Sequence, residues 1–293
     1  MPLSEADQDA FVAKLVGSET AEKGAVDYVS TRPPMRLLTR VGEQGSSLRR
    51  PRDTLRLVMV SDTHERHRLL DMPPGDVLVH SGDILLFNSS YSRETTMRKL
   101  RDFDDWLAAL PYREKVVVAG NHDYGLQELG REGVRAALPS CTYLENEYCQ
   151  LESGLRIFGS PASIPNLLPA WRGGGVSNSP NRAFQYTSQP GDGYAGTEAD
   201  LAAVFDNAPG GLDLLLVHGP IESMEPVREY VLRERPPLVV CGHVHEQHGV
   251  QLVGDTLVVN ATSMGPTFSP TEAPLILDLA VPANASRPAA ARL

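Results

Sequence analysis

Five short polar segments, each directly after a run of apolar and mostly β-branched residues, constrain this chain more than any other feature. Every segment carries carboxylate, amide or imidazole side chains, which are ligands for divalent metal ions. Ligand groups in sheets of α/β proteins gather at the carboxyl ends of the strands, so we expect the five segments to converge in space. They are Ser61–His64, Ser81–Asp83, Gly120–Asp123, Val217–Gly219 and Gly242–His245.

The spread of these segments bears on domain organisation. They extend over most of the 293 residues and must meet, which favours one large domain over two small ones. Apolar residues make up 41% of the chain, which is enough for a packed core. The formal net charge of −10 argues against a nucleic acid as the main partner.

Cysteine usage and hydropathy predict a cytoplasmic protein without a membrane partner. Cys141, Cys149 and Cys241 are odd in number and form no close pair, which favours a reducing compartment. Residues 1–17 contain early acidic residues and lack the apolar stretch of a signal peptide. No window holds 18 consecutive apolar residues, so we expect no transmembrane helix.

The order of hydrophobic patterns indicates an α/β protein, with a parallel sheet in the first half and antiparallel strands added near the end. Helical patterns cover residues 93–110, 198–205 and 222–233, and a further helix is expected near 5–16. Strands are expected at 55–60, 77–80, 115–119, 155–159, 212–217, 238–241, 249–253, 256–260 and 275–279.

Composition divides the chain into three parts, the second of which contains a long loop. We expect residues 1–54 to form an N-terminal extension that packs on a domain at 55–280. Within that domain, residues 161–197 are rich in Pro, Gly, Asn and Ser. A loop of this length indicates either a wall on the substrate side or disorder. The Ala-, Pro- and Arg-rich residues 281–293 are expected to form a flexible tail.

Most of the five segments are weak signals when each is taken alone. Asp62 and His64 can aim at one point past a strand end, but this spacing is common by chance. The Gly-Asp pair at Asp83 also occurs in ordinary turns, and a lone histidine such as His218 more often has a structural role. Gly242–His245 is the strongest, because its two imidazoles can each face a different metal. Together, the ordered segments predict a two-metal hydrolytic site.

In this order the segments resemble the calcineurin-like metallophosphoesterase superfamily, with its D-x-H, G-D, G-N-H-[D/E], strand-end His and G-H-x-H pattern. Longer segments around these motifs are similar to the subgroup named for metallophosphoesterase-domain-containing proteins, a class III phosphodiesterase subgroup that includes UPF0046-like proteins. These segments are SDTHE, HSGD, AGNHD, IFGSP, VHGP and GHVHEQHGV. The similarity covers residues 55–265 and implies a four-layer αββα sandwich of two mixed β-sheets flanked by helices.

The resemblance implies two divalent metal ions that share one bridging carboxylate, Asp83. Ligation by oxygen and nitrogen without thiolate suits Mn, Fe, Zn, Ni or Co, and we expect Mn or Fe. One ion would be held by Asp62, His64, Asp83 and His245, and the other by Asp83, Asn121, His218 and His243.

The expected reaction is hydrolysis of a phosphate ester by a hydroxide that the metal ions generate from water. The resemblance implies that His122 contacts the scissile phosphate and assists the leaving group.

A small phosphorylated substrate is expected, first of all a cyclic nucleotide or a similar diester. A phosphomonoesterase acting on a nucleotide or metabolite is the alternative, and a nucleotide-binding or scaffold protein is the alternative of another class. Some relatives carry glycine in place of His243 and are weak enzymes, so His243 favours an active catalyst. The oligomeric state is left open.

Three residues of the long loop are candidates for substrate contacts. Arg172 and Arg182 are candidates to bind phosphate or base, although solvated arginines are the alternative. Phe184 is a candidate to stack on a base, with core packing as the alternative. Relatives usually have a tryptophan and a compact aromatic loop after G-S-P, so we expect the substrate wall here to differ.

Overall fold

The structure is a computed structural model in which residues 54–86, 91–165, 181–188, 193–265 and 268–280 are described, with residue 191 and the strand segments 28–29 and 37–39. The expected helix near 5–16, the tail and Arg172 lie outside these residues. The predicted boundary at residue 54 stays a prediction. Two strand segments before it, 28–29 and 37–39, pair with each other, and the second also pairs with the strand at residues 278–279.

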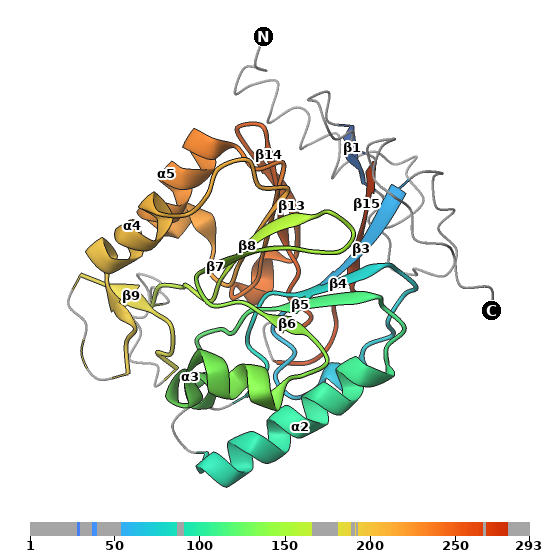
Figure 1. Ribbon diagram of the computed structural model, residues 1–293, viewed down its shortest axis with the longest axis vertical. Coiled ribbons are helices and arrows are strands. Elements are labelled where there is room, and N and C mark those ends of the chain that lie inside the picture. The colour runs from blue at the N-terminus through green and yellow to red at the C-terminus, as the bar shows by residue number, and fades with distance from the viewer. Residues whose placement is uncertain are drawn as a thin grey trace.

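The first sheet is mixed and brings together strands from both ends of the chain (Figure 1). Four neighbouring strands at one end of this sheet run parallel, and the last strand of the chain pairs antiparallel with the first of them. In spatial order it contains β1 (Tyr28–Val29), β2 (Leu37–Thr39), β15 (Leu275–Ala280), β3 (Thr54–Val60), β4 (Val77–His80), β5 (Glu114–Val117) and β6 (Thr142–Tyr143).

The second sheet is also mixed, with four parallel strands between two antiparallel edge strands. A separate pair, β9 (Tyr186–Thr187) and β10 (Gly196–Thr197), lies in the long loop. In spatial order the second sheet contains β13 (Gly249–Val253), β14 (Thr256–Asn260), β12 (Leu238–Cys241), β11 (Leu214–Val217), β8 (Arg156–Ser160) and β7 (Glu147–Gln150).

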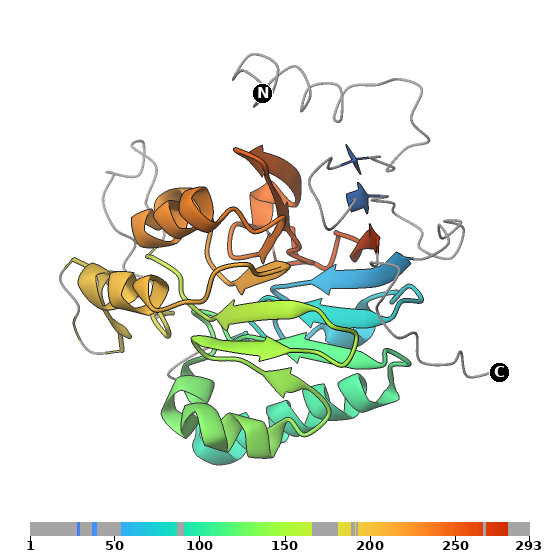
Figure 2. The same cartoon turned by 45° about the horizontal axis from the view of Figure 1, so that its top comes forward.

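Helices cover the outer faces of both sheets, which gives the four layers expected from the resemblance (Figure 2). On the first sheet lie α2 (Arg93–Ala109) and α3 (Tyr124–Ala137), and on the second lie α4 (Glu198–Asp206) and α5 (Glu225–Glu234). Short 3-10 turns occur at His67–Leu69, Ile221–Ser223 and His245–Gln247. Within the described residues, no helix is long and apolar enough to cross a membrane.

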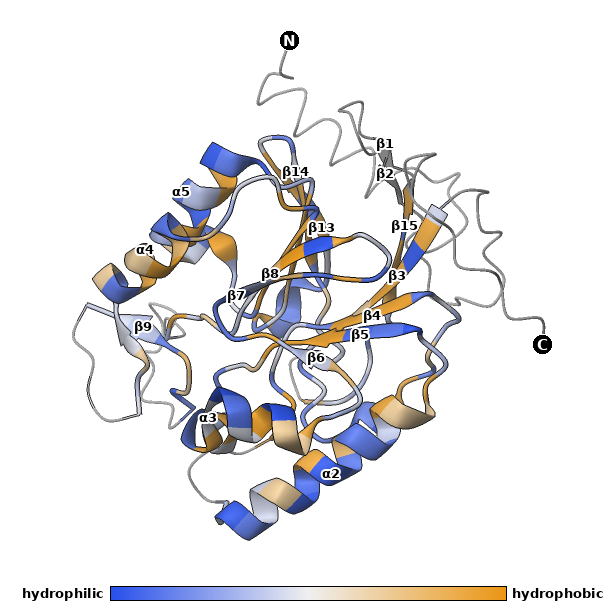
Figure 3. Ribbon diagram, viewed as in Figure 1, coloured by the Kyte–Doolittle hydropathy of each residue, from blue (hydrophilic) through white to orange (hydrophobic). Residues whose placement is uncertain are grey.

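The strands inside each sheet, such as β3, β4, β11, β12 and β14, are buried on both faces, because each sheet has a helix layer on one side and the other sheet on its inner side. On β3, Leu57 and Met59 pack between the sheets, whereas Val58 and Val60 pack against the helices. Figure 3 shows the resulting apolar strands and the polar outer faces of the helices. The continuous apolar runs read from the sequence are therefore strands of a sandwich core.

Two helices differ from expectation for local reasons. The pattern at 222–233 is divided, since Met224 is not helical and Pro226 lies in the first turn of α5. Helix α3 was not predicted, because glycines interrupt its apolar pattern. One of them, Gly125, packs against α2: a Cβ there would lie 2.5 Å from Oγ1 of Thr96.

The carboxyl ends of the two sheets are joined directly. Ser61 pairs with Thr262, linking the end of β3 to the segment after β14. The hydroxyl of Ser81, after β4, donates to the carbonyl oxygen of Cys241 on β12 at 2.9 Å. These contacts bring the polar segments of both sheets to one place.

A buried ion pair on the first sheet provides a test of the fold. Arg56 and Asp278 lie opposite each other on β3 and β15 and form two hydrogen bonds of 2.8 and 2.7 Å. Asp278→Leu leaves a buried guanidinium without this partner and should lower the free energy of unfolding by about 3–5 kcal/mol. The double variant Arg56→Met/Asp278→Leu should recover most of that loss in urea unfolding. Equal loss in both variants would contradict this account.

Candidate metal centre

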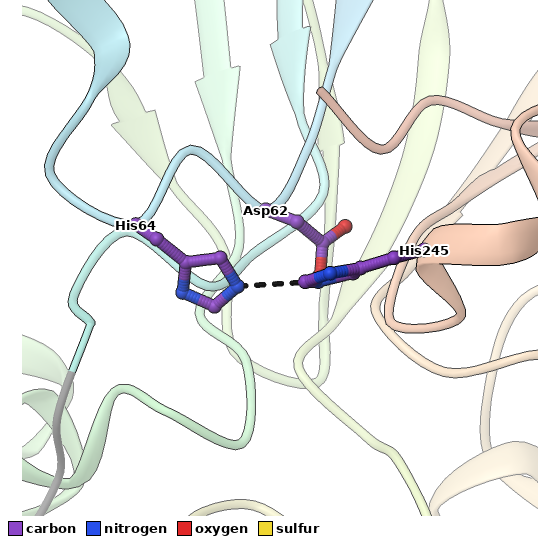
Figure 4. A group of neighbouring side chains, drawn as sticks. All are labelled: Asp62, His64 and His245. Carbon is purple, nitrogen blue, oxygen red and sulfur yellow. Dashed lines mark hydrogen bonds and ion pairs between the residues drawn. The ribbon is translucent and has the colours of Figure 1, made fainter. Parts of the chain in front are cut away.

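The first cluster of possible ligands combines side chains from both sheets. Asp62 and His64 follow β3 of the first sheet, and His245 follows β12 of the second. Nε2 of His64 lies 3.3 Å from Nε2 of His245, which in turn lies 3.6 Å from Oδ1 of Asp62. Figure 4 shows the two imidazoles approaching each other with the Asp62 carboxylate beside them. These three atoms form one of the groups that could hold a metal ion.

The second cluster centres on the amide oxygen of Asn121. Nδ1 of His243 lies 2.7 Å and Nε2 of His218 lies 2.9 Å from Oδ1 of Asn121. Since this oxygen can only accept, each imidazole places a proton between itself and the amide in the absence of a cation. Oδ1 of Asp83 lies 3.3 Å from the same nitrogen of His218.

Asp83 lies between the two clusters. Its Oδ2 is 3.8 Å from Nε2 of His64, while its Oδ1 faces His218. Oδ1 also accepts the backbone N–H of His122 at 2.8 Å, and the residue is 2% exposed. A carboxylate in this position could be shared by two metal ions, if each cluster held one.

The backbone at the site is unusual. Asp62, His64, Asp83 and His243 have positive φ angles between 42° and 70°. Side chains other than glycine rarely adopt this conformation, and it concentrates at functional sites where the surrounding structure enforces it. Hydrogen bonds between the loops supply that enforcement: the N–H groups of Asp62 and His64 donate to carbonyl oxygens of Gly82 and Asp83.

Two glycines permit the close approach of the loops. A Cβ at Gly120 would lie 2.3 Å from Oδ1 of Asp83. A Cβ at Gly242 would lie 2.2 Å from Oδ2 of Asp62. Both distances are far below van der Waals contact, so each glycine leaves room for a carboxylate.

Backbone carbonyls fix the orientation of two histidines. Nδ1 of His64 donates to the carbonyl oxygen of Leu85 at 2.9 Å, and Nδ1 of His218 donates to that of Ser81 at 2.8 Å. Because Nδ1 carries the proton in each case, Nε2 is directed to the cluster. This arrangement is the usual one for metal-binding histidines.

Burial and neighbouring charges shift the pKa values of the candidate ligands in different directions. Burial alone would raise the pKa of Asp83 and Asp62, but neighbouring histidines hold both well below the ordinary value. Burial lowers the pKa of His64 to about 4 and that of His243 to about 3. Burial also lowers the pKa of His218, but the carboxylates of Asp83 and Asp62 outweigh burial and raise this pKa to about 9.

The residues present fit a pair of divalent cations. Metal–ligand bonds of about 2.0–2.2 Å place neighbouring ligand atoms roughly 3–3.5 Å apart, close to the separations in both clusters. In the second cluster, Nδ1 of His243 and Nε2 of His218 both approach Oδ1 of Asn121, so these three atoms could turn to one ion. The structure thus brings all seven expected ligands together: Asp62, His64, Asp83, Asn121, His218, His243 and His245.

His122 differs from the ligands in its surroundings. Its Nδ1 donates to the carbonyl oxygen of Leu86 at 2.6 Å, and its Nε2 lies 2.8 Å from Nδ2 of Asn181. Nε2 is also 3.9 Å from Oδ2 of Asp83, so distance alone does not exclude it as a ligand. Contact with an amide outside the clusters is consistent with the substrate-facing role expected for it.

Asn181 is a site residue that sequence reasoning missed. Besides its contact with His122, its carbonyl oxygen accepts from Nδ2 of Asn121 at 3.2 Å, which turns Oδ1 of Asn121 to the histidines. The only signal was its position directly before Arg182, a candidate for a substrate contact. A second missed residue, Phe268, packs against His64, His122 and His245.

Arg182 and Phe184, two of the candidates for substrate contacts, lie in different surroundings. Arg182 lies with its guanidinium 5.4 Å from the centre of the Tyr194 ring and is partly exposed. Phe184 is 5% exposed and packs in the apolar cluster under the helices of the first sheet, which is the alternative considered for it. Its backbone N–H donates to Oε1 of Gln127.

The part of the chain that carries these site residues is similar to known proteins. The family model described as "Calcineurin-like phosphoesterase superfamily domain" matches residues 55–280. Metallophosphoesterase domain-containing protein 1 of Homo sapiens is 29% identical over 271 residues, covering 80% of this chain and 74% of that protein. UPF0046 protein C25E10.12 of Caenorhabditis elegans is 27% identical over 286 residues, covering 85% of this chain and 86% of that protein.

The position of Asp83 between the two clusters predicts joint loss of both metals on its substitution. Asp83→Ala removes a carboxylate that both clusters use, so bound Mn²⁺ measured by mass spectrometry should fall from about two ions per chain to near zero. Asp102→Ala, an exposed carboxylate on α2, is the control and should leave metal content unchanged. Retention of one full equivalent by Asp83→Ala would contradict the bridging role.

Metal affinity should also depend on pH with a definite sign. His218, with a pKa of about 9, must release a proton on binding, whereas His64 and His243 are already neutral near pH 7. Mn²⁺ affinity should therefore rise between pH 6 and 8, by up to roughly tenfold per pH unit for each displaced proton. Calorimetry in buffers of different ionisation enthalpy counts the released protons. Affinity that does not change over this range would refute the assignment.

Proposed function

Since this chain belongs to the calcineurin-like phosphoesterase superfamily and is thereby a phosphoric ester hydrolase, we propose that it is a metal-dependent phosphodiesterase acting on a small diester. A cyclic nucleotide is the first candidate substrate. The observation that supports the proposal most is the convergence of Asp62 and His64 with Asp83 and His218, which come from two sheets. His243 is present and its Nδ1 faces Asn121, unlike the glycine of weakly active relatives.

The two clusters would each hold one divalent cation, of which Mn or Fe is our first choice. When bound, such ions neutralise charge on phosphoryl oxygens and lower the pKa of a coordinated water toward neutrality. Asp83 keeps the two positions adjacent, and the backbone hydrogen bonds of His64 and His218 keep their Nε2 atoms directed inward. The protein thereby orients the phosphate before reaction.

His122 has the geometry of a proton donor or electrostatic clamp. Its Nδ1 proton is committed to the carbonyl oxygen of Leu86, so Nε2 is the atom that can exchange a hydrogen bond with substrate. In the structure Nε2 contacts the Asn181 amide, which can rotate to serve either protonation state of the imidazole. The leaving oxygen of an ester would take or share this position.

The choice of a diester rests on the subgroup resemblance, because the same metal core serves monoesters. The acidic chain favours a small phosphorylated partner over a nucleic acid. The free thiols of Cys141, Cys149 and Cys241 fit a reducing compartment such as the cytoplasm. Nothing in the proposal requires a membrane.

The test is a paired substrate panel with Mn-loaded protein. It includes 2′,3′- and 3′,5′-cyclic nucleotides, bis(p-nitrophenyl) phosphate, 5′-nucleotides and p-nitrophenyl phosphate. We expect kcat/KM for diesters to exceed that for the matched monoesters by tenfold or more. A large monoester preference would make the protein a phosphatase. Nucleotide binding without turnover would make it a binding protein.

His122→Ala separates chemistry from metal binding in the same assay. It should lower kcat by about 10²–10³-fold, the range for one general acid or one charge-stabilising donor, with metal content near that of the unaltered chain. Arg182→Ala, in the long loop expected to form a wall on the substrate side, is measured beside it for comparison. Loss of both metals in His122→Ala would make this residue structural.

A further inference from the structure

Phe268 places an aromatic ring against three histidines of the site. Its ring centre lies 4.9 Å from that of His64, 4.8 Å from that of His245 and 6.0 Å from that of His122. It thus contacts two proposed metal ligands and the histidine proposed to face substrate. The side chain is partly exposed, so it is not enclosed in the core.

The backbone that carries this ring adopts a strained conformation. Phe268 has a φ angle of 56°, which is rare for a bulky residue. Its N–H donates to the carbonyl oxygen of Gly265 at 3.0 Å, and the N–H of Gly265 donates to that of Ser269 at 2.8 Å. Upstream, the N–H of Ser263 donates to the carbonyl oxygen of Ser61, directly before Asp62. The turn is therefore anchored to the site itself.

The location follows from topology. The segment between Asn260 and Leu275 leads from β14 of the second sheet to β15 of the first. It therefore connects the sheets at the edge where the ligand segments of both sheets meet. A side chain on this connection can contact His64 from one sheet and His245 from the other.

We propose that Phe268 is the aromatic wall of the substrate pocket and that the enzyme prefers esters whose organic group is planar and uncharged, such as aryl or nucleoside esters. This inference rests on the proposed function, because it concerns the substrate of the same site. A phosphate that reaches both His122 and the clusters has its substituent within reach of this ring. Stacking and edge-to-face contacts occur at centre separations of about 4.5–7 Å, the range in which the ring already lies from its neighbours.

The test compares ligands that differ only in their organic group. Binding of phenylphosphonate and methylphosphonate to the Mn-loaded protein is measured by calorimetry. We expect the unaltered chain to prefer phenylphosphonate, and Phe268→Ala to reduce that preference by about five- to tenfold. Phe268→Leu keeps apolar bulk without a ring face and should lie between them. Leu69→Ala, an exposed apolar residue elsewhere, is the control and should change nothing.

Kinetics and metal content separate stacking from mere support of the histidines. KM for bis(p-nitrophenyl) phosphate should rise about five- to tenfold in Phe268→Ala, with kcat within about twofold and Mn content unchanged. Loss of Mn, or an unchanged phenyl-to-methyl preference, would overturn the inference. If the unaltered chain shows the binding preference, and Phe268→Ala loses it, but no ester is hydrolysed, the proposed function fails, whereas the role of Phe268 in binding a planar organic group stands.

Discussion

The buried carboxylate of Asp83 is the constraint on which the site depends. A charge that is 2% exposed is tolerated only with close partners, and this one has the backbone N–H of His122 and the imidazoles of His64 and His218. These partners come from both sheets. The two sheets must therefore keep a fixed relative position for the carboxylate to remain satisfied, and the same fixed position defines both metal clusters.

A second buried carboxylate, Asp123, supports the first without joining the clusters. It accepts the N–H groups of Ile84, Leu85 and Gly120, and so ties the loop after β4 to the loop after β5. Burial and the nearby charge of Asp83 raise its pKa to about 7 despite these three donors. Its side chain does not cap α3, but its backbone carbonyl oxygen accepts the N–H groups of Leu126 and Gln127 in the first turn of that helix.

Much of the fold and of the ligand set could be predicted because the signals are local. A strand buried on both faces must be continuously apolar, and a ligand at its carboxyl end follows immediately in the chain, as Val217 and His218 illustrate. The four-layer arrangement came from the family resemblance, not from periodicity. Helix α3 and the break at Met224 were missed, because glycines and a proline hide helices whose stability comes from packing.

The sequence by itself determined which residue types stand at the strand ends and in what order, and hence the family and the metal chemistry. Only the tertiary structure decided that Asn181 contacts His122 and that Phe268 lies against the histidines. Asn181 and Phe268 belong to loop segments without periodicity, and their contacts with His122 and His64 join parts of the chain that are far apart in sequence. No local pattern encodes such contacts, because they arise only when the packing of the two sheets brings the loops together.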